Sequence, residues 1–239
     1  MNETNLSQLV ASYQPSADVV RIVRGTKILL LVGISGAGKD TIKHRLLDTG
    51  KYHHIVSHTT RSLRENAGVM EQDGVEYHFI TPHTAENMLR NGEFVEAKEY
   101  SGNMYGTSTA ELQWAQDTGK IATTDLEVQG VAEYKALSKD VIAVFILPPS
   151  YDEWQRRLSA RYGSKGADPA DMQKRMHTAI TELEDALKQN YYHFVINEDI
   201  NKAVESVDMI AHNHDKFNPV DDAIRLRAEQ LLADLSSHL

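Results

Sequence analysis

Apolar residues along this chain occur either in short continuous runs or at helical spacing. Continuous runs lie at residues 27–33, 121–125 and 141–147, and a shorter one lies at 193–197. Runs of this kind are typical of strands that are buried on both faces of a parallel sheet. The pattern therefore predicts four buried strands.

Helices are predicted between these runs, where apolar residues recur every three or four positions. The expected helices cover residues 39–47, 128–137, 150–162, 168–189 and 199–212. The alternation of buried strands and helices predicts an α/β fold with a mostly parallel sheet flanked by helices.

Two regions interrupt this alternation. Residues 57–107 contain short strand-like pieces at 77–80 and 94–98 and a helical stretch at 84–90, which predicts a small α+β insertion. Residues 161–174 are charged and contain glycine and proline, which predicts a mobile helical lid between two helices.

Both ends of the chain carry amphipathic patterns. Ser16 precedes a short apolar-periodic stretch that ends at Gly25, which predicts a capped helix. Near the other end, apolar residues at helical spacing predict a helix that begins near Pro219 within residues 216–239.

Composition narrows the class of protein. The 239 residues are 41% hydrophobic and 25% charged, as in an ordinary globular protein. Because 34 acidic residues face 25 Lys and Arg, the net charge of −9 argues against nucleic-acid and membrane partners. The absence of cysteine excludes a disulfide framework and thiol catalysis. With no candidate membrane span and no signal-peptide pattern, we expect a cytoplasmic protein.

A glycine-rich loop follows the first buried strand and precedes a helix. Residues 33–39 match the pattern G-x-x-x-x-G-K. In such a loop, backbone N–H groups and the helix N-terminus surround a phosphate, and the lysine reaches the outer phosphates. The sequence therefore predicts a site for nucleotide phosphates at Gly33, Ser35, Gly36, Ala37, Gly38, Lys39, Asp40 and Thr41, and the family resemblance given below implies that this nucleotide is ATP.

Asp40 stands where this loop usually has Ser or Thr to hold Mg²⁺. Thr41 comes about 100° further round the helix, so it does not simply replace that hydroxyl. A carboxylate is a suitable oxygen ligand, so our hypothesis is that Asp40 binds Mg²⁺ directly or through water. The alternative is that Asp40 only stabilises the helix N-terminus.

Several further motifs occur in order along the chain, at 57–64 (SHTTRSLR), 73–79 (DGVEYHF), 92–96 (GEFVE), 102–107 (GNMYGT) and 125–130 (DLEVQG). Together with the loop, they make residues 27–213 resemble the guanylate kinase family. The resemblance implies a P-loop kinase core at 27–56 and 108–213, a GMP-binding insertion at 57–107 and a lid at about 157–175. Residues 1–26 and 214–239 then form an N-terminal extension and a C-terminal amphipathic helix.

The resemblance also implies roles for single residues. Lys39, Arg157, Arg161 and Arg175 match the catalytic cations, and Asn197 matches the edge of the adenine site. The implied GMP-binding residues are Ser57, Arg61, Arg64, Tyr77, Glu96, Tyr105, Thr107, Asp125 and Glu127. Arg156 is adjacent to Arg157, and the sequence leaves open which of them faces the site.

The chemistry of these residues suits GMP. Arginines and tyrosine hydroxyls are natural donors to a phosphate dianion. Glu96 can accept hydrogen bonds from both N1–H and the 2-amino group of guanine, a pair that adenine lacks, while Thr107 can donate to the guanine O6. Glu127 departs from the family, which usually has Asp there.

The expected activity is the transfer of a phosphoryl group from ATP to GMP, and to dGMP, with Mg²⁺ as cofactor. Three alternatives stay open: a ribose bisphosphate kinase, since those relatives also carry Asp after the loop lysine; another small-molecule phosphotransferase; and a non-catalytic scaffold. The expected partners are small nucleotides, with a homodimer as a further possibility.

Overall fold

The computed structural model of the chain describes residues 6–66, 68–162, 169–213, 216 and 222–239. The described residues form two compact units. The first takes its residues from 1–28, 52–124 and 132–141, and the second from 29–51, 125–131 and 142–239. The chain passes between the units inside two strands, after Ile28 and after Thr124.

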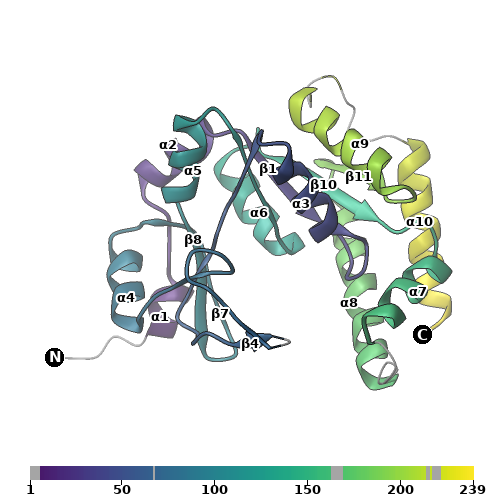
Figure 1. Cartoon of the computed structure of the whole chain (residues 1–239), viewed down its shortest axis with the longest axis horizontal. Helices are drawn as coiled ribbons and strands as arrows, with labels where there is room; N and C mark the ends of the chain where they lie inside the picture. Colours follow the sequence, from purple (N-terminus) through teal and green to yellow (C-terminus); the bar gives the residue numbers. More distant parts are fainter. Residues whose placement is uncertain (1–5, 67, 163–168, 214–215, 217–221) are drawn as a thin grey trace. The chain divides into compact units, whose positions relative to one another are not determined.

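The second unit is built on parallel strands in the order β11-β10-β1. Leu30 lies opposite Ala143, and Val144 lies opposite His193. All residues of β1 and β10 are buried, in agreement with their continuous apolar sequences. The elements of this unit, seen in Figure 1, are β1 (Ile28–Val32), α3 (Lys39–Asp48), β10 (Ile142–Leu147), α7 (Tyr151–Tyr162), α8 (Pro169–Leu187), β11 (Tyr192–Ile196), α9 (Ile200–Asn213) and α10 (Asp222–Ser237).

The first unit contains a four-stranded sheet in the order β6-β3-β8-β7 and a parallel pair of strands, β2 and β9. Strands β7 and β8 are antiparallel, as are β3 and β8, whereas β3 and β6 are parallel. The elements are α1 (Leu6–Ala11), α2 (Ala17–Gly25), β2 (Tyr52–His54), β3 (His58–Thr59), β4 (Glu65–Asn66), β5 (Val69–Met70), β6 (His78–Phe79), α4 (Pro82–Arg90), β7 (Phe94–Tyr100), β8 (Asn103–Ser108), α5 (Ala110–Asp117) and β9 (Ile121–Asp125). Helix α6 (Val128–Leu137) begins in the second unit and continues into the first.

A small apolar cluster fills the space beside the four-stranded sheet of the first unit. Its buried members are Ala85, Leu89, Phe94 and Met104. Helix α1 packs on this cluster, and Figure 1 shows α1 next to α4 and β7. The N-terminal segment thus packs against the core of this unit with partly buried side chains.

Most elements predicted from the hydrophobic pattern are confirmed with small shifts at their ends. The helix at 128–137 and the strand at 121–125 agree at both ends, and Ser16 caps α2 by accepting a hydrogen bond from the Val19 amide. The pattern missed α1, α5 and β8, and it also missed the short strands β2, β3, β4 and β5. Helices of six or eight residues depend on tertiary packing, so their sequence periodicity is weak.

Two predictions fall partly outside the described residues. In the predicted lid at 161–174, residues 163–168 are not described, and α8 begins at Pro169. The terminal helix is present as α10 from Asp222, and Val220 and Pro219 lie outside the described residues. Within the described part of the chain, no helix combines the length and the apolar character needed to cross a lipid bilayer.

Candidate functional site

The glycine-rich loop of the second unit joins the buried strand β1 to α3. Gly33 passes so close to β10 that a Cβ atom there would lie 2.2 Å from the carbonyl oxygen of Ile146. Gly38 immediately precedes α3 with a φ of 99°, a left-handed conformation that favours glycine. Both glycines are therefore required by the path of the backbone. This path gives the strand–loop–helix arrangement in which backbone N–H groups bind phosphate.

Two side chains from distant parts of the chain hold the backbone of the loop. Trp154 of α7 donates its indole N–H to the Ser35 carbonyl at 2.8 Å. The buried Asn197, directly after β11, donates its amide to the Ala37 carbonyl, also at 2.8 Å. These contacts hold the carbonyls of the loop and leave Asn197 in a supporting position beneath it.

Of the arginines predicted at the start of the lid, Arg157 is described with its contacts, whereas the side chain of Arg161 is not described. Arg157 contacts the loop side of the unit: it donates to the Asn197 carbonyl at 2.9 Å and to Glu153 at 2.7 Å. Arg156 is exposed and pairs with Glu153 alone among the contacts described for it, so Arg157 is the one directed to the loop. The side chain of Arg161 lies outside the described residues.

Arg175 connects α8 to the glycine-rich loop. Its guanidinium donates to the Ser35 hydroxyl at 3.2 Å and to Asp171 at 3.0 Å. Two of the three predicted arginines thus lie at the loop, and each is already paired with a carboxylate on its own helix.

Lys39 and Asp40 begin α3 directly after the loop. The Lys39 ammonium donates to the carbonyls of Gly33 and Ile34, so it is folded over the loop. Asp40 and Thr41 are exposed in the first turn of the helix. Both positions are open to a ligand at the helix N-terminus.

The predicted acidic pair follows β9. Asp125 forms an ion pair with Lys43 of α3. Although burial acts to raise the pKa of Asp125, the nearby Lys43 and Lys39 hold it below its usual value. Glu127 is exposed. Asp125 is therefore ionised and fixed beside the loop lysine, whereas Lys43 was not predicted from the sequence.

Glu182 of α8 is a further residue that the sequence analysis missed. Burial raises its pKa from 4.5 to about 7; Glu127 adds to this rise and Lys39 opposes it. A single glutamate at helical spacing carries no sequence signal for such a location. Lys39 therefore lies in the field of Asp125 and Glu182 together.

Replacing Glu182 with glutamine should change how stability depends on pH. A carboxyl whose pKa is higher in the folded than in the unfolded chain binds more protons when folded, so stability falls as pH rises from about 4.5 to about 7. Glu182→Gln removes this loss, and we expect its melting temperature to exceed that of the wild type by more at pH 8 than at pH 5. Thermal melts at both values measure this. Glu184→Gln, an exposed change on the same helix, is the control; equal differences at both pH values would contradict the prediction.

A second polar cluster lies in the first unit between β7, β8 and the segment before β3. Thr107 donates its hydroxyl to Glu96 at 2.9 Å and lies 3.3 Å from the Ser57 hydroxyl. Burial raises the pKa of Glu96, while the Thr107 hydrogen bond acts in the opposite direction. The sequence analysis predicted that the Thr107 hydroxyl donates to the guanine O6, whereas in the structure it donates to Glu96. The hydroxyl has one hydrogen, and the adjacent carboxylate is the stronger acceptor.

Buried polar atoms surround this cluster. Within the described residues, Oε2 of Glu133 on α6 has no hydrogen-bond partner, and the buried hydroxyl of Tyr134 lies near Thr107 without a hydrogen bond of good geometry. Burial raises the pKa of Tyr134, and the charge of Glu96 adds to this rise. Lys98 lies 3.4 Å from Glu133. Unsatisfied buried groups are costly, so they mark a place where a polar ligand would be favoured.

The predicted phosphate grip lies in the same unit around a buried ion pair. Arg61 donates hydrogen bonds from both terminal nitrogens to Glu71 at 2.8 Å, and the side chains of Arg61 and Glu71 are 8% and 7% exposed. The Glu71 carboxylate also accepts from the backbone amide of Arg64 at 2.8 Å. The rings of Tyr77 and Tyr105 meet edge to face at 5.8 Å. Glu71, which the sequence analysis did not single out, therefore organises this grip.

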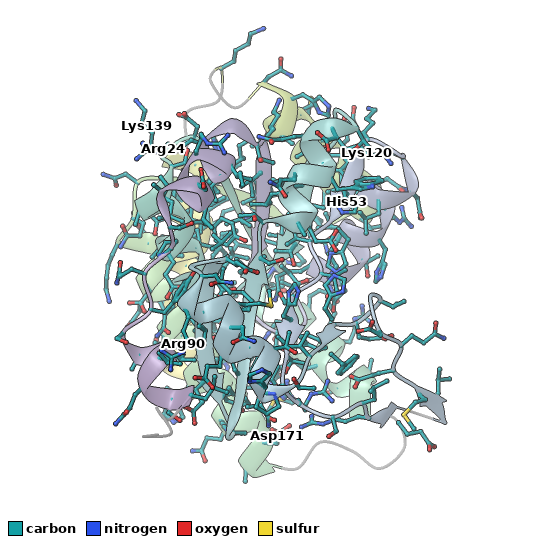
Figure 2. All side chains as sticks on the ribbon, turned by 90° about the vertical axis from the view of Figure 1, so that its left-hand side faces the viewer. Arg24, His53, Arg90, Lys120, Lys139 and Asp171 are labelled. Carbon is teal, nitrogen blue, oxygen red and sulfur yellow. The ribbon has the colours of Figure 1, made fainter. Side chains whose placement is uncertain are left out.

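A histidine–carboxylate network supports the same strands. Glu111 of α5 binds His53 and, at 2.8 Å, His78. The His53 and Trp114 rings lie 4.0 Å apart, tilted by 34°, and the Lys120 ammonium lies 5.2 Å from the centroid of a Trp114 ring; Figure 2 shows His53 and Lys120 near each other. Among the described residues, no group of three or more His, Cys, Asp or Glu side chains is arranged to hold a metal ion. We read this network as structural.

The chain is similar to proteins of one family. The sequence model described as guanylate kinase matches residues 25–214. Relatives include a guanylate kinase of Bdellovibrio bacteriovorus, 36% identical over 74% of this chain and 92% of the relative, and one of Schizosaccharomyces pombe, 37% identical over 77% and 89%. A guanylate kinase 1 of Oryza sativa is 33% identical over 84% of this chain, which spans 52% of that relative.

A solved structure agrees with this likeness. The crystal structure of guanylate kinase from Anaplasma phagocytophilum matches with a TM-score of 0.56 and 25% sequence identity. The match covers 80% of this chain and 87% of the other. The α/β fold expected from the hydrophobic pattern and the P-loop kinase core implied by the resemblance are thereby confirmed.

Proposed function

This chain belongs to the guanylate kinase family, and from that premise we propose that it transfers the γ-phosphoryl group of ATP to GMP or dGMP, giving ADP and GDP or dGDP. The main support for a guanine nucleotide as acceptor is the Glu96 carboxylate, which Thr107 holds in a partly buried cluster. A carboxylate fixed in this way accepts from N1–H and the 2-amino group together, and it is left unpaired by adenine.

The proposed roles divide between the two units. In the second unit, the loop residues 33–41 and Asn197 serve ATP, and Lys39, Arg157, Arg161 and Arg175 neutralise the transferring phosphoryl group. In the first unit, Glu96 and Thr107 hold the base, and the phosphate is held by Arg61, Arg64, Tyr77 and Tyr105. The resemblance assigns Ser57 to the phosphate grip as well; because its hydroxyl lies beside Thr107, we propose that it serves the base instead. Asp125 and Glu127, which belong to the second unit, contribute to GMP binding. We further propose that residues 57–107 form the GMP-binding insertion and that about 157–175 form the lid.

The chemistry requires little from a general base. The attacking phosphate oxygen of GMP is already largely ionised near neutral pH, since the second pKa of a phosphate monoester is about 6. Catalysis therefore depends on alignment and on neutralising negative charge. Lys39 is suited to this because its ammonium already lies over the loop. Arg157 and Arg175 are suited because they already contact Asn197, just after β11, and Ser35 of the loop.

Magnesium fits the oxygen ligands at the start of α3. Mg²⁺ in phosphoryl-transfer enzymes is usually held by one or two carboxylates together with water and phosphate oxygens, so a dedicated cluster of three acids is not needed. Asp40 is exposed in the first turn of α3, where it can serve as such a carboxylate. When bound, the ion neutralises part of the phosphate charge.

Asp40→Ser tests the role of this carboxylate. If Asp40 holds Mg²⁺ directly or through water, the free Mg²⁺ concentration that gives half-maximal rate should rise about tenfold, because a charged ligand is replaced by a neutral one. Initial rates across a Mg²⁺ titration measure this. Asp48→Asn, an exposed change at the other end of α3, is the matched control. An unchanged Mg²⁺ dependence in Asp40→Ser would leave Asp40 with the role of helix N-terminal residue.

The acceptor specificity tests the proposed function directly. ADP release is measured with ATP and, in turn, GMP, dGMP, IMP, AMP, UMP and ribose bisphosphate. Turnover with GMP and dGMP far above the others supports the proposal. Preference for ribose bisphosphate would assign the chain to that reaction, and turnover with none of them, while GMP still binds, would indicate a scaffold.

A further inference from the structure

Strand β7 carries an irregularity immediately before Glu96. Phe94 lies opposite Ser108 and Glu96 lies opposite Thr107, so β7 has one more residue than β8 over this step. Val95 is the additional residue of this β-bulge. A bulge changes which face of the sheet the following side chains point to.

The packing of the strand shows what the bulge does. Phe94 and Ala97 both contact the apolar cluster of Ala85, Leu89 and Met104. In a regular strand, residues three positions apart face opposite sides of the sheet. The bulge brings Phe94 and Ala97 to the same side, and Glu96 then faces the opposite side, where it meets Thr107. Without the bulge, Glu96 would share a face with Phe94 and point into the apolar cluster.

Tyr13 holds this bulge. Its hydroxyl donates to the carbonyl oxygen of Phe94 at 2.5 Å. Its ring also meets the Phe94 ring edge to face, with centroids 6.2 Å apart. A bulge disrupts the regular ladder of backbone hydrogen bonds, and a buried carbonyl requires a donor. Burial raises the pKa of Tyr13 to about 12, with smaller contributions from the charges of Glu93 and Glu96, so the hydroxyl keeps its hydrogen at neutral pH.

The segment that bears Tyr13 is anchored on both sides of this contact. Before it, Leu6, Leu9 and Val10 of α1 pack on the apolar cluster. After it, the amide of Ser16 donates to the carbonyl of Gly92 at 3.2 Å. This segment precedes the residues that match the family, which begin at residue 25. Tyr13 thus lies outside the residues that the family model matches and contacts the strand that carries Glu96.

We propose that Tyr13 is a positioning residue for guanine recognition: by donating to the Phe94 carbonyl, it fixes the bulge that turns the Glu96 carboxylate toward Thr107 and the acceptor base. This inference rests on the proposed function and adds a residue from outside the matched family region to its acceptor site.

Tyr13→Phe is the test, because it removes the hydroxyl and keeps the ring that packs on Phe94. We expect KM for GMP to rise about fivefold to tenfold, and the preference for GMP over IMP to fall about fivefold, since IMP lacks the 2-amino group that Glu96 accepts. The kcat and the KM for ATP should stay within about twofold of wild type, because the ATP loop is not touched. Amide hydrogen exchange should become faster at residues 93–100.

Tyr100→Phe is the matched control, since it is the same substitution at an exposed position of the same strand. Unchanged KM and unchanged GMP preference in Tyr13→Phe would overturn the inference, as would an equal loss for ATP and GMP that follows a lower melting temperature. If the wild type does not phosphorylate GMP, the proposed function fails instead. In that case the exchange of residues 93–100 still decides whether Tyr13 holds the bulge, and unchanged exchange there would overturn that part.

Discussion

Lys39→Ala is expected to lower kcat for GMP phosphorylation about 10³-fold, the loss typical when a charge-stabilising donor to a transition state is removed. Lys39 is the cation of the glycine-rich loop, and its ammonium is already placed over the loop by the carbonyls of Gly33 and Ile34. The neighbouring Asp125 keeps its own partner, Lys43. The fold should therefore persist, and the loss should appear mainly in kcat rather than in KM for GMP.

Steady-state rates and thermal melts of three variants separate charge from position. Lys39→Arg keeps the positive charge but changes its geometry, so it should recover part of the loss at most. Lys51→Ala removes an exposed lysine of the same unit that pairs with Asp208, and it should behave as wild type. Near wild-type rates in Lys39→Ala would refute the assignment of the loop to ATP.

The parts of the site that could be predicted from sequence are those in which the signal is local. The buried strand β1, the glycine-rich loop and α3 follow each other along the chain, so periodicity and glycine spacing locate them. The residues Glu96 and Thr107 were found because each lies inside a short motif of the family. The structure then brings them together as neighbours across β7 and β8.

The remaining residues depend on contacts between distant parts of the chain. Tyr13 and Phe94 are 81 positions apart, and Trp154 and Ser35 are 119 apart. A single tyrosine or tryptophan in a polar segment carries no pattern that names its partner. The bulge at Val95 is also invisible in sequence, because the residues around it read as an ordinary buried strand. Packing decides these features, and they adjust the geometry of the groups that the motifs supply.

The pairing of cations with carboxylates also explains how an acidic chain can bind phosphates. Arg61 is paired with Glu71, Arg157 with Glu153, and Arg175 with Asp171. Each carboxylate holds its arginine in a defined orientation before a phosphate arrives, which reduces the entropy lost on binding. The net charge of −9 is therefore compatible with phosphate ligands. It still disfavours long phosphate polymers, which require a continuous cationic surface.

Glu96→Gln is expected to lower kcat/KM for GMP about 10²-fold to 10³-fold, because it affects two hydrogen bonds to a charged acceptor. A glutamine presents one carbonyl oxygen and one NH₂ group, so one of the two guanine N–H donors would face another donor. Thr107, which now donates to Glu96 at 2.9 Å, would also lose a charged acceptor. Competition assays with GMP, IMP and AMP measure the effect.

The ratio between acceptors distinguishes recognition from stability. Glu96→Gln removes the carboxylate that accepts from the 2-amino group of guanine, so the preference for GMP over IMP should be lost. The weak rate with AMP should change little. Glu99→Gln, an exposed change on the same strand, is the control and should leave all acceptors unaffected. A uniform loss with every acceptor would mean that Glu96 acts on the fold of the first unit and not on the base. Burial raises the pKa of Glu96, so its charged form is unfavourable in the folded unit and Glu96→Gln should stabilise that unit. The substitution should therefore weaken guanine recognition without weakening the fold.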